Sequence, residues 1–281
     1  MRLRSLLFVP ADRPERFAKA AATGADALIL DLEDSVAAER KALGREAVAQ
    51  ALRARDVEAK LFVRVNPLES EFIKADLEAL AGLRPDAVVL PKAEGAESIT
   101  AFLALCAAFD LHAPVLPIAT ETPAAMFQLG SYAAVASSLV GLTWGAEDLP
   151  AAIGALSSRE HDGSYTPPYE LARSLTLFGA HAAGVAALET VFPNFRDLDA
   201  LASYAAKASR DGFTGMMAIH PTQIEVINAA FTPSEEAIAK AQAIVTAFAD
   251  NPGVGALQLA GQMIDAPHLK QAQAVLARAG L

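Results

Sequence analysis

The stretch ALILDLEDSV, residues 27–36, decides the fold of this chain. Its first four residues are apolar and indicate a buried strand. Three carboxylates, Asp31, Glu33 and Asp34, follow within four positions, although ionised carboxylates are costly to desolvate without cations or hydrogen-bond donors nearby. Either these acids cap the next helix, or they belong to a charged site at the carboxyl end of the strand.

Similar apolar runs recur along the chain, and Ala-rich segments with helical spacing, such as 14–24 and 46–56, separate them. The eight expected strands are 5–9, 26–31, 60–65, 86–91, 113–119, 138–144, 184–190 and 215–220. Eight strands alternating with helices predict an α/β fold, a closed (β/α)₈ TIM barrel. The longest irregular stretch, 157–168, follows the sixth strand, where a long loop can cover a site.

The end of the chain follows a different pattern. Two helical segments, 234–249 and about 266–279, come after the eighth strand, and DNPGVGALQLAGQMI joins them. We therefore expect a barrel over residues 1–231 and a C-terminal helical extension or lid over residues 232–281.

Composition limits the class of protein. The chain has 281 residues, of which 53 % are hydrophobic and 20 % charged, as in a globular protein with a large core. A net charge of −10 argues against a general nucleic-acid binder. One cysteine, Cys106, excludes a disulfide framework, and the five histidines lack the paired spacing of a zinc site. With neither an evident signal peptide nor an apolar run of about 20 residues, we expect no membrane insertion and a cytoplasmic location.

Charged residues follow nearly every expected strand, and in a barrel the carboxyl ends of the strands form the active face. Glu121 and Asp148 follow strands five and six, and carboxylate oxygens without histidine or cysteine suit Mg²⁺. Each acid alone could instead be a first-turn helix acid. Arg64 lies inside an apolar strand, so its planar fork either pairs a substrate carboxylate or enolate oxygen, or forms a structural salt bridge.

Lys92 and a group of cations near the start of the sequence each have two possible roles. Lys92 is a charge partner of the DLED acids or a Schiff-base amine, and its acidic neighbours favour the first. Five cations in the first 20 residues form either an anion-binding footprint suited to phosphates or a solvated helix face: Arg2, Arg4, Arg13, Arg16 and Lys19.

Seven motifs together resemble the HpcH/HpaI aldolase and citrate lyase β-subunit-like family, near its malyl-CoA and citramalyl-CoA lyases. They are SLLFVPADRPERFAKA, DALILDLEDSV, LFVRVNP, AVVLPKAE, ATETP, LTWGAEDL and GFTGMMAIHPTQI, and the match runs from about residue 4 to 281. The resemblance implies a Mg²⁺-dependent barrel, with Mn²⁺ as a substitute. It would make or break a carbon–carbon bond in malyl-, citramalyl- or citryl-type thioesters, with cleavage releasing a keto acid and an acyl-CoA.

By that resemblance, Glu121 and Asp148 match the metal ligands and Arg64 matches the arginine that binds the substrate carboxylate and keto group. Glu33 and Asp34 would orient metal-bound water and basic partners. The substrate- and CoA-binding residues would be Phe8, Arg13, Lys19, Arg64, Lys92, Glu147, His220 and Pro221. Ala11 and Glu189 depart from the family pattern, which usually has Gly and Asp there.

The segment GQMIDAPHLKQA resembles the C-terminal lid of trimeric CoA lyases. The resemblance implies a homo-oligomer, a trimer or a multiple of it, in which Asp265 reaches a neighbouring subunit's site as acid/base. Asp265 could instead only cap the helix that follows.

Other functions also fit the motifs. A citryl-acyl-carrier lyase subunit shares nearly all of them, and a malyl-CoA thioesterase would add hydrolysis to cleavage. A pyruvate-type aldolase lacks the CoA-contacting first motif. The intact set of Arg64, Glu121, Asp148 and Asp265 argues against a non-catalytic ligand-binding barrel.

Overall fold

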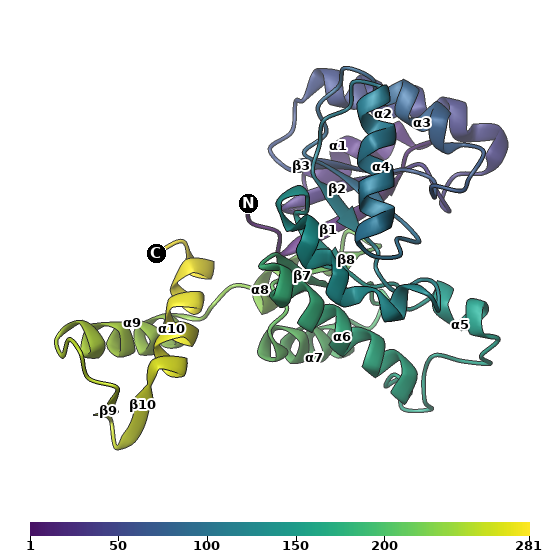
Figure 1. Ribbon diagram of the computed structural model, residues 1–281. Helices are drawn as coiled ribbons and strands as arrows, with labels where there is room; N and C mark the ends of the chain where they lie inside the picture. Colours follow the sequence, from purple (N-terminus) through teal and green to yellow (C-terminus); the bar gives the residue numbers. More distant parts are fainter. The chain divides into compact units, whose positions relative to one another are not determined.

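The computed structural model describes residues 1–281, which form two compact units, residues 3–228 and 229–281 (Figure 1). The boundary between the units falls three residues before the one expected from the sequence. None of the helices is both long and apolar enough to cross a bilayer.

The first unit is a (β/α)₈ barrel of eight parallel strands, which confirms the predicted fold. Its strands are β1 (Ser5–Pro10), β2 (Ala27–Asp31), β3 (Lys60–Arg64), β4 (Ala87–Leu90), β5 (Val115–Pro117), β6 (Gly141–Thr143), β7 (Ala186–Glu189) and β8 (Gly215–Ala218). Hydrogen-bonded neighbours run in the order β5-β4-β3-β2-β1-β8-β7-β6. Two isolated bridges, Val115–Leu139 and Ile118–Thr143, complete the barrel between β5 and β6.

The strands are apolar on both faces because the barrel interior and the surrounding helices bury both. Leu6, Ile29, Phe62, Val89 and Leu116 belong to one core cluster, and none of them is exposed. Each such side chain contributes about 1.5–3 kcal/mol relative to exposure to water. Because side chains fill the barrel interior, we expect binding and catalysis at the carboxyl ends of the strands.

The helices of the first unit alternate with its strands (Figure 1). They are α1 (Phe17–Ala21), α2 (Lys41–Ala54), α3 (Ile73–Leu80), α4 (Ala96–Ala108), α5 (Asp148–Ile153), α6 (Pro167–Ala183), α7 (Leu198–Asp211) and α8 (Gln223–Ala230), with 3₁₀ segments η1 (Pro14–Arg16), η2 (Ala38–Arg40), η3 (Ala125–Phe127) and η4 (Leu129–Ser138). α2 begins before the expected residue 46 because η2 leads into it, and it ends at Ala54, just before Arg55, whose φ is +43°. The expected helix 14–24 is only η1 followed by α1.

The loop between α5 and α6 is irregular, as expected, apart from one bridge between Arg159 and Tyr165. The Arg159 guanidinium lies 4.0 Å from the centroid of the Tyr165 ring. Tyr165 is buried and packs edge-on against Trp144, with ring centroids 5.0 Å apart. The aromatic contact therefore ties this loop to the end of β6.

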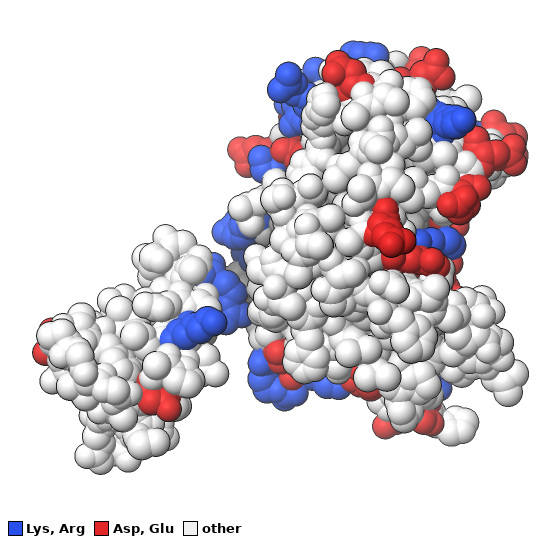
Figure 2. Space-filling view, in the orientation of Figure 1, with Lys and Arg blue, Asp and Glu red and all other residues white.

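One face of the first unit carries few charges, and Figure 2 shows the largely uncharged surface over η4 and α6. Three large apolar side chains from η3 and α6 are exposed to solvent: Phe127, Leu171 and Phe178. Large apolar side chains are typically covered where they gather at protein–protein contacts.

The second unit consists of α9 (Glu235–Ala249), the antiparallel strands β9 (Ala256–Leu259) and β10 (Gln262–Asp265), and α10 (Ala266–Ala279). Its small core includes Ile244, Ile264 and Leu276. Both expected helices are present. The hairpin between them was not expected, and its turn places Ala260 and Gly261 at φ values of +50° and +80°.

Candidate active site

The centre of the site is an ion pair between neighbouring strands. Asp31 ends β2 and lies in register with Arg64 at the end of β3. Its two carboxylate oxygens lie 2.6 and 2.7 Å from Arg64 Nε and Nη2, in a bidentate arrangement. Burial raises the pKa of the Asp31 carboxyl, but the Arg64 guanidinium together with hydrogen bonds from Ser35 and Glu33 outweighs burial, and the net shift is downward. The pair therefore carries full charges and fixes the plane of the guanidinium.

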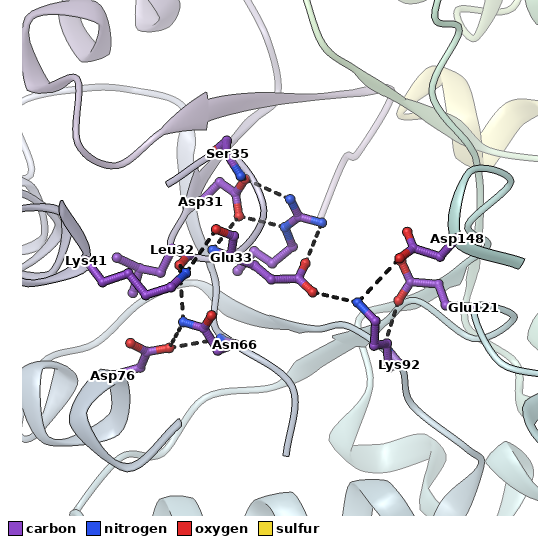
Figure 3. A network of polar contacts seen from close by, with 11 residues as sticks. Asp31, Leu32, Glu33, Ser35, Lys41, Asn66, Asp76, Lys92, Glu121 and Asp148 are labelled. Atoms are coloured by element: carbon purple, nitrogen blue, oxygen red, sulfur yellow. Dashed lines mark hydrogen bonds and ion pairs between the residues drawn. The ribbon is translucent and has the colours of Figure 1, made fainter. Parts of the chain in front are cut away.

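Glu33 extends this pair into a chain of charges (Figure 3). Its Oε2 lies 2.7 Å from Arg64 Nη1, and its Oε1 lies 2.9 Å from Lys92 Nζ. Burial raises the pKa of Glu33, against the pull of both cations. The Phe8 ring covers the Arg64 guanidinium, 4.8 Å from its centroid. Arg64 is thus held on several sides before any substrate arrives.

Lys92 links this chain to the acids after β5 and β6. Its φ is +54°, a left-handed conformation that costs a residue with a side chain about 1–3 kcal/mol. In this conformation its N–H donates to Glu121 Oε2 at 2.6 Å, while its Nζ lies 3.4 Å from Asp148 Oδ1. Burial lowers the pKa of the Lys92 ammonium, but the carboxylates of Glu33, Glu121 and Asp148 together outweigh burial and the pKa is raised. A stabilised ammonium is the opposite of what a Schiff-base amine needs, so the geometry favours the charge-partner interpretation.

Glu121 and Asp148 form an acid pair that fits a hard cation. Glu121 is buried, and burial together with the Asp148 carboxylate raises its pKa to about 8. Gly145 leaves room for it, because a Cβ there would lie 2.6 Å from Glu121 Cγ. The structure forms no cluster of three or more His, Cys, Asp or Glu side chains that could hold a metal. Two carboxylates, with water and substrate completing the shell, is the arrangement typical of Mg²⁺.

These groups open into a cavity of about 420 Å³ at the carboxyl ends of the strands. Its charged lining is acidic apart from Arg64, and its apolar lining includes Phe8, Ile118 and Met217. No residue of the loop 157–166 lines it, so the structure does not place that loop over this cavity. A deep apolar wall with a few convergent polar groups is the usual form of a small-molecule site.

Residues 4–221 match the sequence profile of one family, described as HpcH/HpaI aldolase/citrate lyase. The chain belongs to that family.

Individual members of the HpcH/HpaI family resemble the chain over nearly its whole length. The citrate lyase subunit beta-like protein of Mycobacterium tuberculosis is 40 % identical over 274 residues, which cover 98 % of this chain and 94 % of the relative. The mitochondrial citramalyl-CoA lyase of Rattus norvegicus is 34 % identical, covering 97 % of this chain and 85 % of the relative. The crystal structure of CitE from M. tuberculosis in complex with magnesium, acetoacetate and coenzyme A is similar with a TM-score of 0.84 at 38 % identity, covering 99 % and 98 % of the two chains.

A second cavity, of about 360 Å³, contains several residues that the family resemblance assigned to CoA. Phe8, Lys19, His220 and Pro221 line it, and Phe8, Pro10 and Ile219 also line the first cavity. His220 stacks on Phe195, with centroids 4.6 Å apart. The predicted CoA residues therefore lie beside the predicted chemical site.

Four other expected residues are more peripheral. Asp34 and Glu147 line the first cavity and are exposed. The Arg13 side chain is 51 % exposed, lines neither cavity, and has its Nε 3.9 Å from Asp12 Oδ1. Asp265 belongs to the second unit, at the start of α10, where its Oδ1 lies 2.5 Å from His268 Nδ1. This contact is a helix-capping arrangement, and it does not test a role in catalysis.

Two residues of the site were noticed in the sequence but not assigned a specific role. Asp31 was quoted among the DLED acids but not assigned a role, although it is the bidentate partner of Arg64. Its position at the end of a strand adjacent to the Arg64 strand was the available signal. Arg16 belonged to the N-terminal cation group and lines the second cavity.

Glu189, which departs from the family's usual Asp, lies behind the site. Its carboxylate accepts hydrogen bonds from Trp144 Nε1 and from Arg173 Nε, the latter at 2.7 Å. The same carboxylate accepts the N–H of Thr190, which lines the first cavity. Glu189 thus ties the end of β7 to the residue that follows β6.

Proposed function

We propose that this protein is a Mg²⁺-dependent carbon–carbon lyase that cleaves a β-hydroxyacyl-CoA thioester of the malyl, citramalyl or citryl type. The products are a keto acid and an acyl-CoA. The observation that carries the proposal is Arg64, locked by Asp31 and Glu33 and sharing a cavity with the Glu121–Asp148 acid pair. Family membership supports it, as do the citramalyl-CoA lyase relative and the CitE complex with magnesium, acetoacetate and coenzyme A.

The metal would be held by the carboxylates of Glu121 and Asp148, which line the same cavity as Gly145. When bound, Mg²⁺ supplies a Lewis acid for the substrate's hydroxyl and carboxylate oxygens and offsets the charge of the two acids. Lys92 steadies both ligands, because its N–H bonds to Glu121 and its Nζ lies near Asp148.

Side chains of the protein bind the substrate, offset its negative charge and transfer protons. Cleavage passes the hydroxyl proton to water, turns the hydroxyl carbon into a carbonyl, and leaves the electron pair of the broken bond on the α-carbon of the thioester. Arg64 presents a fixed donor fork to the carboxylate and the forming keto oxygen. Asp265 returns a proton to the α-carbon, and removes it in the reverse condensation. Glu33 and Asp34 orient water and the cations around this centre.

The CoA part of the substrate lies along the second cavity, where Arg16 and Lys19 provide positive charge for phosphates. Phe8 lines both cavities, so it stands between the reacting acyl group and the carrier. Of the remaining expected contacts, Glu147 borders the acyl end and His220 the carrier end.

We also propose a homo-oligomer, a trimer or a multiple of it, in which Asp265 serves a neighbouring copy. The exposed Phe127, Leu171 and Phe178 support an interface between copies, since such side chains are typically covered in assemblies. A cytoplasmic location stays a prediction from the sequence.

The decisive experiment incubates the purified protein with malyl-, citramalyl- and citryl-CoA and measures keto acid and free thiol separately. We expect keto acid with Mg²⁺ or Mn²⁺ and none after EDTA, because the site offers only oxygen ligands. Free thiol formed at the rate of keto acid would favour the thioesterase. Activity only on a carrier-bound thioester would favour the citrate lyase subunit. Inactivity on every thioester would refute the lyase.

A further inference from the structure

Lys41, the first residue of α2, is a lysine buried beneath the acidic loop 31–36. Only 6 % of its surface is exposed, and lysine is almost never buried to this degree without a partner. Its Nζ donates to the main-chain carbonyls of Leu32 at 2.8 Å and Glu33 at 3.1 Å. The same ammonium lies 5.1 Å from the centroid of the Phe72 ring. Its hydrogen bonds thus go to the backbone of the loop.

Lys41 supplies a second donor to each of these two carbonyls. Strand β2 ends at Asp31, and beyond it the Leu32 carbonyl otherwise accepts from Asn66 Nδ2 and the Glu33 carbonyl from the Val36 N–H, so removal of the ammonium leaves each buried carbonyl with one partner. The loop's own hydrogen bonds are few. The N–H groups of Glu33 and Ser35 donate to the Asp31 carboxylate at 3.0 and 3.3 Å, and that of Val36 donates to the Glu33 carbonyl at 3.1 Å.

A second buried group supports the same backbone (Figure 3). Asn66 Nδ2 donates to the Leu32 carbonyl at 3.1 Å and to Asp76 Oδ2 at 2.6 Å. Asp76 is fully buried and also accepts the N–H of Asn66 at 2.9 Å. Gly44 lets α2 approach, since a Cβ there would lie 3.2 Å from Leu32 Cδ2. The close packing of α2 brings Lys41 under the loop.

We infer that Lys41 is a positioning residue for the proposed reaction: by holding the carbonyls of Leu32 and Glu33, it aims the Glu33 carboxylate between Arg64 and Lys92. Glu33 is the link that joins the Arg64 fork to Lys92 and, through Lys92, to Glu121 and Asp148. Lys41 lines neither cavity, so it acts through the loop and touches no substrate. This inference rests on the proposed lyase function.

The test compares Lys41→Met with Arg4→Met. Lys41→Met keeps most of the side chain and removes the ammonium. Arg4→Met is the matched control, because it removes a largely buried cation that pairs with Asp26 just before β1 and β2, away from the carboxyl ends. Arg4 lines neither cavity, so the structure takes it out of the anion-binding group considered from the sequence. Both variants lose an ion or hydrogen-bond partner, but only Lys41→Met loosens the acidic loop.

For Lys41→Met we expect kcat to fall about tenfold to a hundredfold, because misplacement of a reacting group by about 1 Å has effects of that size. The KM for the CoA thioester should change less than about threefold, since the residues of the second cavity are untouched. Arg4→Met should lower thermal stability and leave kcat unchanged.

Hydrogen–deuterium exchange supplies a readout without activity. Amides 33–36 should exchange faster in Lys41→Met, while those of the barrel strands keep wild-type rates. Lys41→Gln, whose amide keeps N–H donors on a shorter, uncharged side chain, allows the same comparison if Lys41→Met fails to fold. Wild-type kcat and exchange in a folded Lys41 variant would overturn the inference, as would an equal loss of kcat in Arg4→Met. If the wild type cleaves no thioester, the proposed function fails, while local exchange still decides the role of Lys41 in the loop.

Discussion

Gly145→Ala tests whether the space beside Glu121 is needed for metal binding. The added Cβ would lie 2.6 Å from Glu121 Cγ and 3.0 Å from its Oε1, whereas ordinary contacts begin at 3.4 Å. Glu121 must therefore move by about 0.8 Å. It has little freedom to do so, because it is buried and its Oε2 is held by the N–H of Lys92 at 2.6 Å. The φ of Gly145 is not positive, so the substitution tests space alone.

A ligand displaced by nearly 1 Å should weaken Mn²⁺ binding about tenfold to a hundredfold and lower kcat by a similar factor. The free Mn²⁺ signal in an electron paramagnetic resonance titration measures the affinity without any turnover. Gly130→Ala is the matched control, since no atom lies within 4 Å of a Cβ there, and it should bind Mn²⁺ like the wild type. A folded Gly145→Ala variant with wild-type Mn²⁺ affinity would refute the assignment of Glu121.

Three further outcomes follow from the geometry. Arg64→Lys should lower kcat/KM about a hundredfold in a folded protein, because an ammonium cannot reproduce the bidentate guanidinium held by Asp31. Near wild-type kinetics would indicate that Arg64 forms only a structural salt bridge. Mixing Asp265→Ala with Arg64→Ala, each nearly inactive, should partly restore activity if Asp265 serves a neighbouring copy; no recovery with verified subunit exchange would contradict this. Burial raises the pKa of Cys106 to about 12, so a thiol reagent at pH 8 should label it only after denaturation, and rapid labelling of the native protein would count against the buried thiol.

The barrel was predictable from sequence because its strands are apolar on both faces and so produce strong continuous signals. The acidic loop was predictable as a charged site because ionised carboxylates next to a buried strand are costly to desolvate unless cations lie nearby. Lys92 is indeed paired with Glu33. What the sequence could not show is which acid meets which cation. The Asp31–Arg64 pair depends on strand register, and the register of β2 and β3 appears only when the barrel closes.

Other features were missed because their local signals are weak or absent. The β9–β10 hairpin turns at Ala260 and Gly261, and alanine at a left-handed position is not the Asn-Gly or Asp-Gly pair that usually indicates such a turn. Lys41 has the sequence context of an ordinary surface residue at the start of a helix. Its burial depends on the close approach of α2 to Leu32, a tertiary contact that no periodicity in the chain predicts.

The incomplete pairing of β5 with β6 has a mechanical consequence. Every other neighbouring pair of strands shares a continuous ladder, while these two are joined only by isolated bridges. Glu121 lies just beyond β5 and Asp148 just beyond β6, so the two acids stand on opposite sides of the barrel's weakest seam. Burial and the Asp148 carboxylate raise the pKa of Glu121 to about 8, so without a cation Glu121 is mostly protonated at neutral pH. A bound ion would favour its charged form and would join the two sides of this seam. The ion proposed for the chemistry would then also hold β5 and β6 together. We expect thermal unfolding of the metal-free barrel to begin between these two strands.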